Sequence, residues 1–445
     1  MLFVVSRVSY LKSQSSINSP YSRYGIGDLQ NSGFARNAGM GGLGIAFQND
    51  TLSPFFINNQ NPASYASMRL TVFEAGVLSN TYNTQSASDK QTKNSTSLGY
   101  IGFGIPIKKW WGTSFGLMPY SNVGYKISDQ QTLDSIGKVD YLYQGSGGIN
   151  KIYFGNALKL KNLSVGANAS YLFGTINYMK QAVFSNTGYL NTRINKSISV
   201  NDLYLDYGLQ YTIKIDSLRK KILVKTESGT KVSRVKKDID DVKITFGATL
   251  VMQSDINAKS NTLAQTCLVI FGYETIKDTN QNTVDQKGSL SLPLCFGAGL
   301  TVKKGNRWMI AADYLAQKWS GYSVFGYNPG LKNSTKITLG GKYVSAKVGS
   351  IQSGYWKRVQ YLAGLKYYQT YLELYNTQLS EYALSLGIGL PVGRQKVRDY
   401  YSIVNLSVEL GQRGTISNNL IKEQFARITL GFTVNDRWFI PRRID

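Results

Sequence analysis

The sequence predicts an all-β protein: a 14-stranded antiparallel β-barrel that crosses a membrane. Three observations lead to this prediction: the alternation of residue types, the composition, and the lengths of the connections. From residue 70 onward, apolar residues alternate with small or polar ones, which is typical of strands with two different faces. The alternating segments lie near 70–82, 95–107, 112–126, 149–160, 163–177, 201–214, 241–253, 289–303, 306–320, 335–345, 357–371, 384–390, 404–411 and 427–434. Their number is even, as in bacterial outer-membrane barrels.

The last of these segments shows the alternation clearly. Ile428, Leu430 and Phe432 fall on one side of the strand, and Arg427 and Thr429 fall on the other. Many of the segments run to ten residues or more. A strand that crosses a bilayer at a tilt needs ~9–11 residues, whereas strands of soluble proteins are mostly ~5–6 residues long. The segment lengths therefore favour membrane-spanning strands.

The composition agrees with a membrane barrel and argues against an enzyme. Charged residues make up 17% of the chain, which also holds 44 Gly and 31 Tyr, and no apolar run is long enough for a membrane-spanning helix. The absence of histidine excludes Ser-His-Asp relays, histidine general bases and His-containing zinc sites. Cys267 and Cys295, the two cysteines, cannot form a four-thiolate cluster. We therefore expect no catalytic residues, no metal and no cofactor.

The connections between the segments alternate between short and long. Those at 108–111, 161–162, 303–306 and 390–396 are short, and those near 127–148, 178–200, 254–288 and 321–334 are mostly longer and rich in Ser, Asn, Gln and Thr. Outer-membrane barrels have short periplasmic turns and longer outer loops. The connection at 215–240 departs from this rule, because it is long and basic but falls at the end of the short turns.

Charged residues fall on the side of the strands that we assign to the barrel interior. In a dry core each would cost several kcal/mol unless it were paired. We expect them to form ion pairs that brace the barrel rather than to bind a ligand. They are Glu74, Asp206, Lys243, Asp313, Arg358, Lys366, Glu409 and Arg427.

Two prolines, Pro119 and Pro293, each interrupt a predicted strand. Proline cannot donate a hydrogen bond to a neighbouring strand, so it marks a bulge, a kink or an edge. Aromatic residues near the predicted strand ends suggest the girdles of a membrane barrel, with ordinary strand propensity as the alternative. These aromatics are Trp110, Trp111, Tyr314, Trp319, Tyr367, Tyr371 and Trp438.

The first seventy residues differ in character from the rest and carry a resemblance. A glycine-rich segment with Gly39, Gly41, Gly42 and Gly44 precedes Asn49-Asp50, and Asn61-Pro62-Ala63 comes just before the first strand. This order resembles the N-terminal hatch of the FadL-type fatty-acid channel family. The segment from Ser19 to Leu29 and the chain end from Asn435 resemble a FadL-like branch common in the Bacteroidota.

The resemblance implies that the N-terminal segment folds as a hatch inside the barrel and controls a passage for hydrophobic small molecules. Clustered glycines allow tight turns and close packing on the wall; a phosphate-binding loop is disfavoured, because no Lys-Ser/Thr follows them. The strand kinks at Pro119 and Pro293 would then mark side passages toward the bilayer, with an ordinary bulge as the alternative. Outer-membrane lipid and a hydrophobic ligand are the expected partners.

Three other functions compete with a passage for hydrophobic molecules. FadL-like barrels also serve as accessory parts of the type IX secretion apparatus, so an accessory or plug subunit of an outer-membrane secretion or assembly complex is the alternative to a passage. A nucleic-acid binder would explain the net charge of +24, but the basic residues are spread through turns and loops and suit anionic lipid head groups better. An outer-membrane enzyme is disfavoured, because the lipase, acyltransferase and protease barrels use histidine in their chemistry and this chain has none.

The predicted organisation follows from these observations. Residues 1–14 resemble a degenerate export signal that Arg7 interrupts, 15–69 form the hatch, 70–439 form the barrel and 440–445 form a periplasmic tail. The protein is expected in the outer membrane.

Overall fold

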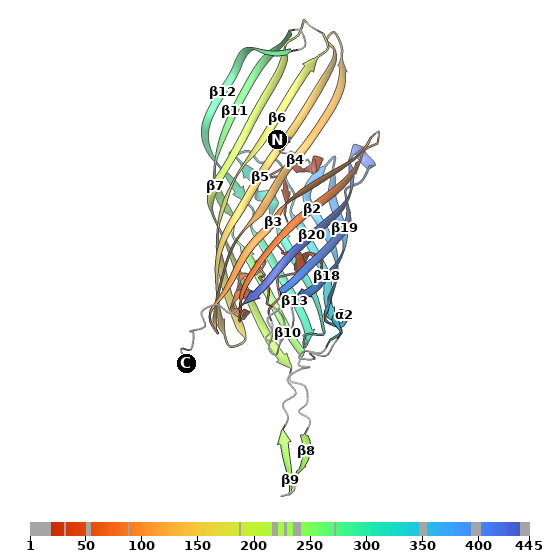
Figure 1. The fold of residues 1–445 in the computed structure, drawn as a ribbon. Helices are drawn as coiled ribbons and strands as arrows, with labels where there is room; N and C mark the ends of the chain where they lie inside the picture. Colours follow the sequence, from red (N-terminus) through yellow and green to blue (C-terminus); the bar gives the residue numbers. More distant parts are fainter. Residues whose placement is uncertain are drawn as a thin grey trace, which may run out of the picture.

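The computed structural model confirms the closed barrel. It describes residues 19–30, 33–49, 55–87, 89–186, 188–215, 221–226, 229–234, 242–270, 273–346, 354–392 and 402–436. The predicted signal at 1–14, Trp438 and the tail at 440–445 lie outside these residues. Fourteen antiparallel strands form a ring (Figure 1), and each corresponds to one predicted segment. The first and last of them, β2 and β20, close the ring by pairing along their length, from Thr71 with Asp436 to Gln85 with Lys422.

The ring follows the order of the chain. Its strands are β2 (Thr71–Gln85), β3 (Lys90–Lys108), β4 (Trp111–Leu133), β5 (Gly137–Leu160), β6 (Leu163–Phe184), β7 (Asn191–Ile215), β10 (Val242–Val251), β13 (Cys295–Lys304), β14 (Trp308–Gln317), β16 (Ser334–Val344), β17 (Gln360–Leu374), β18 (Thr377–Val392), β19 (Ser402–Arg413) and β20 (Lys422–Asp436). Apolar side chains point outward along these strands, as Leu203 and Leu205 do on β7, while the alternating residues Tyr204 and Asp206 are buried.

The predicted outer loops are wrong in part, because three of them are strands. Strands β4 to β7 continue well beyond the ring, and the hairpin of β11 (Ser254–Ile270) and β12 (Tyr273–Leu292) extends the sheet. The lower half of β7 pairs with β10 and its upper half pairs with β11. Together these strands form an outer extension above one side of the barrel (Figure 1). Polar side chains suit both faces of this extension, since neither faces lipid, and the alternation that reveals a membrane strand is lost there.

The remaining described elements are short. Two more strands, β8 (Lys221–Thr226) and β9 (Gly229–Arg234), pair as a hairpin in the long basic connection at 215–240. A two-residue strand, β15 (Ser323–Val324), pairs with β12. The other elements are η3 (Trp319–Gly321), α2 (Tyr355–Arg358) and η4 (Ser417–Asn419). In the described ranges, no helix has both the length and the apolar character to cross a membrane.

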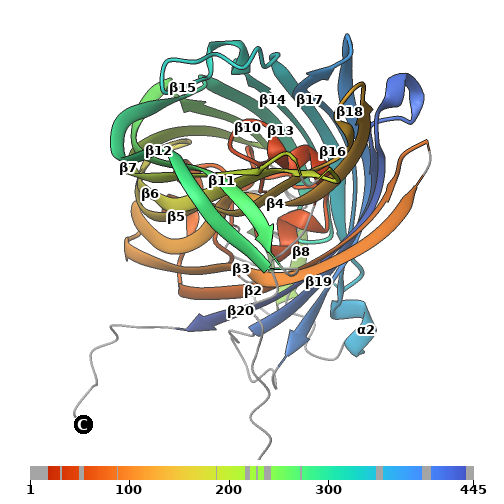
Figure 2. The same ribbon diagram turned by 90° about the horizontal axis from the view of Figure 1, so that it is seen from above.

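The N-terminal segment, residues 19–70 as far as they are described, is enclosed by the ring of strands in the view from above (Figure 2). It contains η1 (Pro20–Arg23), β1 (Asp28–Leu29), α1 (Ala35–Ala38) and η2 (Pro62–Ser67). Its apolar side chains are buried, including Phe34, Met40, Leu43 and Tyr65. They pack against interior-facing residues of the wall such as Tyr153 and Leu362.

Glycines of the barrel wall bring its backbone close to that of the segment. A Cβ atom on Gly112 of β4 would lie 2.1 Å from the Tyr65 carbonyl oxygen, and one on Gly247 of β10 would lie 2.2 Å from that of Ile45. A Cβ on Gly364 of β17 would lie 2.2 Å from the Met40 carbonyl carbon. Only glycine fits at these three places, so wall and segment are shaped to each other.

Candidate binding cavity and its N-terminal latch

Strands β3 and β4 separate part of the way along the wall. They pair from Lys108 with Trp111 to Ile101 with Leu117, and beyond this point the ring strand paired with β3 is β2, and the ring strand paired with β4 is β5. Pro119 lies just past the last pair, beside a register shift between β4 and β5. Since proline lacks the N–H that a ladder needs, it suits the point where β4 loses a neighbour. One edge of β4 is therefore left without a barrel strand.

The N-terminal segment occupies this freed edge. β1 pairs with β4, placing Asp28 opposite Asn122 and Leu29 opposite Ser121. Three more hydrogen bonds extend the contact: the Gln30 N–H donates to the Tyr120 carbonyl (3.0 Å), the Ser19 N–H donates to the Gly124 carbonyl (3.1 Å), and the Gly124 N–H donates to Ser22 Oγ (3.1 Å). The segment thus pairs with β4 where β3 has left it.

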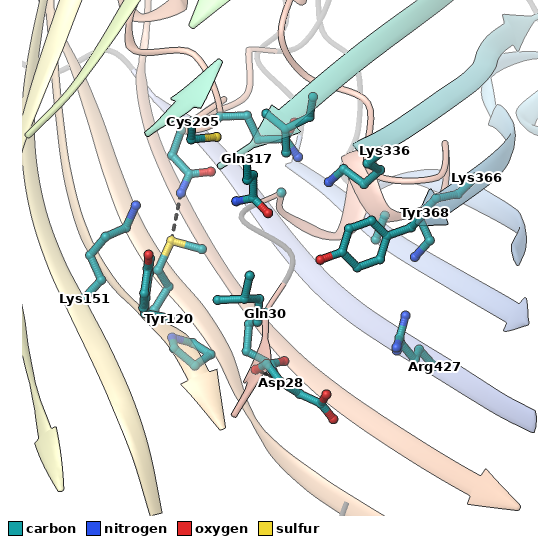
Figure 3. Close-up of a pocket in the computed structure, with 18 of the residues that line it drawn as sticks. Asp28, Gln30, Tyr120, Lys151, Cys295, Gln317, Lys336, Lys366, Tyr368 and Arg427 are labelled. Atoms are coloured by element: carbon teal, nitrogen blue, oxygen red, sulfur yellow. Dashed lines mark hydrogen bonds between the residues drawn. The ribbon is translucent and has the colours of Figure 1, made fainter. Parts of the chain in front are cut away.

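A cavity of about 270 Å³ lies beside this junction, inside the barrel. Residues of the N-terminal segment line it together with residues of both β3 and β4 and of the opposite wall (Figure 3). Its lining mixes apolar and polar groups. The apolar lining includes Leu29, Leu78, Met118, Leu315 and Leu372, and the polar lining includes Asp28, Gln30, Tyr120, Lys151, Gln317, Lys336 and Tyr368.

Two amines enter the cavity from different parts of the wall. Lys151 comes from β5 and Lys336 from β16, and Figure 3 shows both side chains directed inward. Within the part of the chain that the structure describes, neither forms a salt bridge. These amines, with the hydroxyl groups of Tyr120 and Tyr368, give the cavity hydrogen-bond donors for a polar group.

Arg413 at the end of β19 joins the segment to the wall beside this cavity. Its guanidinium lies 2.8 Å from Asp28 Oδ1 and 2.7 Å from Glu423 Oε2, and it also donates to Ser19 Oγ at 2.8 Å. The Ser19 hydroxyl in turn donates to Glu423. All four side chains are buried, so each charge depends on the others for compensation. We call Ser19, Asp28, Arg413 and Glu423 the latch.

Tyr21 adds a hydrogen-bonded contact next to the latch. Its hydroxyl donates to the Ile421 carbonyl at 2.6 Å and accepts from the Ile421 N–H at 3.0 Å. Burial raises the pKa of Tyr21 to about 12. The phenol therefore stays protonated at neutral pH and keeps its role as a donor.

Three of the predicted interior charges form an ion-pair cluster that borders the cavity. Lys366 Nζ lies 2.9 Å from Glu409 and 2.9 Å from Glu381, and Arg427 lies 2.6 Å from Glu409 and 3.2 Å from Glu381. These four side chains come from β17, β18, β19 and β20, so the cluster ties neighbouring strands together.

The other three predicted interior carboxylates accept hydrogen bonds from backbone or amide groups. Glu74 accepts the Ile57 N–H at 2.9 Å, and Asp313 accepts the N–H groups of Gly44 and Ile45 at 2.7 and 3.0 Å. Asp206 accepts from the Asn168 amide at 2.6 Å. Two of the three therefore hold the backbone of the N-terminal segment, because its irregular conformation leaves N–H groups without a neighbouring strand.

Two other interior charges were also predicted. Lys243 lies on β10, whereas Arg358 is not on a strand at all. Arg358 ends α2, just before β17 begins at Gln360, so its predicted interior position is wrong.

The glycines singled out in the sequence have different roles. Gly41 and Gly42 have φ of +75° and +87°, so they turn the chain where a side chain would be strained. Gly39 faces Gly387 of the wall, with its Cβ position 3.1 Å from that Cα. Gly44 packs within the segment against Asn58 and donates its N–H to Asp313. None of them lines the cavity.

The Asn61-Pro62-Ala63 motif begins η2. The Asn61 side chain accepts the Ala63 N–H at 3.1 Å, and Pro62 occupies the first turn, where its missing N–H costs nothing. The Asn61 amide also donates to the carbonyls of Ile45, Leu209 and Ala248 at 2.6, 3.2 and 3.2 Å. The motif therefore fixes the segment to β7 and β10 and is structural in its contacts.

Pro293 does not lie within a strand, and two of the predicted girdle aromatics do not lie on the outer surface. Pro293 lies between β12 and β13, at the corner where the chain leaves the outer extension for the ring. Trp319 and Tyr371 are buried, with ring centroids 4.6 Å apart and ring planes tilted by 31°, and Tyr371 donates to the Gly27 carbonyl at 2.8 Å. These two aromatics are core residues rather than part of a girdle.

Several residues at this site were not singled out in the sequence. Asp28, Lys151, Lys336, Glu381, Arg413 and Glu423 all border the cavity or belong to the latch. Alternation placed Lys366 and Glu409 on the interior face, and the same rule would have placed Lys336 and Glu381 there. Arg413 was missed because it lies past the apolar part of its strand, and its partner Asp28 is 385 residues away.

Comparison with known proteins supports the fold. The family model described as BamG matches residues 1–445. A Pseudomonas aeruginosa FadL homologue is similar in structure, with a TM-score of 0.54, 11% identity and coverage of 92% of this chain and 100% of that one. The Ralstonia pickettii toluene transporter TbuX has a TM-score of 0.56 and 13% identity, with coverage of 92% of this chain and 100% of that one. The Pseudomonas putida toluene transporter TodX has a TM-score of 0.53 and 14% identity, with coverage of 93% of this chain and 100% of that one. No curated protein matches in sequence.

Proposed function

The chain belongs to the BamG family, and we propose that it is a FadL-like outer-membrane barrel that lets hydrophobic small molecules with a polar end pass between the cavity and the bilayer. The passage runs between β3 and β4. The N-terminal segment acts as a hatch, and its first part, residues 19–30, opens and closes the route.

The observation that carries this proposal is the pairing of β1 with the edge of β4 that β3 has left. Two barrel strands that separate within a wall leave a gap on the way to lipid. Here a segment that belongs to no barrel strand covers the gap, and its strand pairing with β4 is only two residues long, with three further hydrogen bonds to that strand. Such a short contact is easier to undo than a full strand pair, since each hydrogen bond adds only ~1 kcal/mol.

The cavity chemistry supports a ligand with two different ends. Leu29, Leu78 and Leu315 offer an apolar surface, and the Lys151 and Lys336 amines face the same space. A purely apolar molecule would leave these amines desolvated, which is costly. The similar solved structures include two toluene transporters, and passage of hydrophobic molecules through this chain is the corresponding proposal.

A reversible disulfide tests the route. Leu29 and Ser121 are direct cross-strand partners, so Leu29→Cys with Ser121→Cys places two thiols at a distance that a disulfide can bridge. Both native cysteines are first replaced by serine. Uptake of a fluorescent fatty acid into liposomes holding the barrel is then measured before and after reduction. We expect uptake to be lost when the disulfide forms and restored by reductant.

A control disulfide lies within the wall. Leu384 and Leu410 are partners on β18 and β19, so Leu384→Cys with Leu410→Cys links strands that are already paired. It should leave uptake unchanged. Equal uptake by the oxidised and reduced Leu29–Ser121 variant would refute the proposed route.

An accessory role in a larger outer-membrane secretion or assembly complex is the second candidate. The observation that favours it is how fully the N-terminal segment packs against the interior wall, since a subunit used as a plug needs no passage. Purification in mild detergent separates the two roles. A barrel that elutes alone and takes up the fatty acid supports passage, and one that elutes with a stoichiometric partner and shows no uptake supports the accessory role.

A further inference from the structure

The outward face of the wall carries a groove of about 720 Å³ across β14, β16, β17, β18 and β19. Its floor is low because two small residues, Gly341 and Ala363, are direct partners on β16 and β17. Ile310 and Leu386 flank them on the neighbouring strands and are 65% and 55% exposed. A side chain at Gly341 would press on the Met309 carbonyl, since its Cβ would lie 2.4 Å from that oxygen. The depression is therefore part of how these strands pack.

One end of the groove is closed by a row of aromatic side chains. Trp308 pairs with Tyr343, and Tyr343 pairs with Tyr361, so the three aromatic residues lie side by side on successive strands. Tyr361 donates to the Trp356 carbonyl of α2 at 3.4 Å, and the Trp356 side chain is 70% exposed. Tyrosine and tryptophan gather where a membrane barrel meets the head groups. This row thus marks the interface on the side of the short turns, which is the periplasmic side.

Two cations lie just beyond the aromatic row. The Val344 N–H donates to the Arg307 carbonyl at 2.7 Å, and the Ala346 N–H donates to the Lys357 carbonyl at 2.6 Å. Residues 344–346 therefore hold Arg307 and Lys357 on either side of the end of β16. Both side chains are exposed, and neither has an acidic partner in the ranges that the structure describes.

We propose that this groove binds a phospholipid with an anionic head group. One acyl chain lies over Gly341 and Ala363, between Ile310 and Leu386. The phosphate lies between Arg307 and Lys357, beyond the row of aromatic rings. Apolar surface, an interfacial aromatic row and unpaired cations follow one another in the same order as acyl chain, glycerol and phosphate in a lipid of the periplasmic leaflet.

Native mass spectrometry of the full chain in mild detergent tests this proposal. The protein is titrated with dioleoylphosphatidylglycerol and, separately, with dioleoylphosphatidylcholine, which has the same acyl chains and no net charge. We expect a discrete one-to-one complex with the anionic lipid and weaker binding of the zwitterionic one. Arg307→Gln and Lys357→Gln should each weaken binding of the anionic lipid about fivefold, because a basic residue near anionic lipid adds ~1 kcal/mol.

Ala363→Phe fills the groove from its floor and tests the acyl-chain part. It should weaken binding of both lipids, whereas the charge variants should affect mainly the anionic one. Ala169→Phe on β6 is the matched control, because Ala169 is also exposed, with the outward-facing Phe154 and Leu205 as its partners. Lys109→Gln, in another short turn, is the control for charge.

The proposal is overturned by any of three results. The first is equal binding of the two lipids by the wild-type chain. The second is an effect of Ala363→Phe no larger than that of Ala169→Phe, together with unchanged binding by the Arg307 and Lys357 variants. The third is a dimer whose interface covers the groove, which would assign this face to a second copy of the chain.

Discussion

The two parts of the N-terminal segment are held in different ways. Residues 19–30 contact β4, β19 and β20 through hydrogen bonds and the buried charges of the latch, and their Tyr21 and Ile26 side chains pack in the apolar cluster that contains Val123. Residues 33–70 pack their apolar side chains and their backbone against the wall, at places where only glycine fits. Directional polar contacts can be exchanged for water, whereas interlocked packing cannot be undone piecemeal. We therefore propose that the first part is released from the wall more easily than the second.

Breaking the latch should have the largest effect. Arg413→Met removes the cation that Asp28 and Glu423 share, and leaving a buried charge without its partner costs ~3–5 kcal/mol. The chain can relieve this cost by releasing residues 19–30 into water. We therefore expect faster proteolysis within this part, measured by mass spectrometry of the fragments, while residues 33–70 stay protected. Equal protection of both parts in the variant would contradict the comparison.

Filling a glycine contact should destabilise the second part directly. Gly247→Val places a side chain against the Ile45 carbonyl, and overpacking of this kind typically costs ~1–3 kcal/mol. The expected result is a lower unfolding temperature in detergent, with no preferential release of residues 19–30. Gly354→Ala is the control, since a Cβ there meets no atom within 4 Å. Selective loss of residues 19–30 in Gly247→Val would show that the two parts are not independent.

The Tyr21 hydroxyl should give the smallest effect. Tyr21→Phe removes the two hydrogen bonds between its hydroxyl and the Ile421 backbone, each worth ~1 kcal/mol, and should increase proteolysis of residues 19–30 slightly. Because burial raises its pKa from 10.0 to about 12, the attachment that Tyr21 provides is complete below pH 10.0 and is lost as the pH rises through about 12. Proteolysis of the wild-type chain should therefore increase more over this interval than that of Tyr21→Phe. Parallel pH profiles would exclude the contribution of Tyr21.

The barrel could be predicted because lipid outside and a polar interior impose one alternation on every strand. The same reasoning failed for β11 and β12, where Asn, Ser, Thr and Lys are frequent and interrupt the apolar alternation. Pro119 predicted a break in the strand pairing, because proline has no N–H to donate to a neighbouring strand. Whether β4 was left open or was covered there could not be predicted, because the covering residues Asp28 and Leu29 lie in a stretch without periodicity.

For the interior charges, too, alternation in the sequence predicts the face of the strand but not every partner. Alternation predicts Lys366, Glu409 and Arg427 on one face, and in the structure their side chains form ion pairs across adjacent strands. It could not reveal that Glu74 and Asp313 serve backbone N–H groups of the N-terminal segment. Such partners depend on how an irregular chain is folded within the ring, and no local pattern encodes that.

The pairing of β2 with β20 also constrains the order of assembly. The ring cannot shut until its final strand has been synthesised, and by then the residues it encloses have long been available. Since these residues immediately precede β2, a still-open sheet can curl around them as it grows. The wall glycines would then be fitted during closure, and a side chain at one of them would hinder biogenesis before it weakened the finished protein.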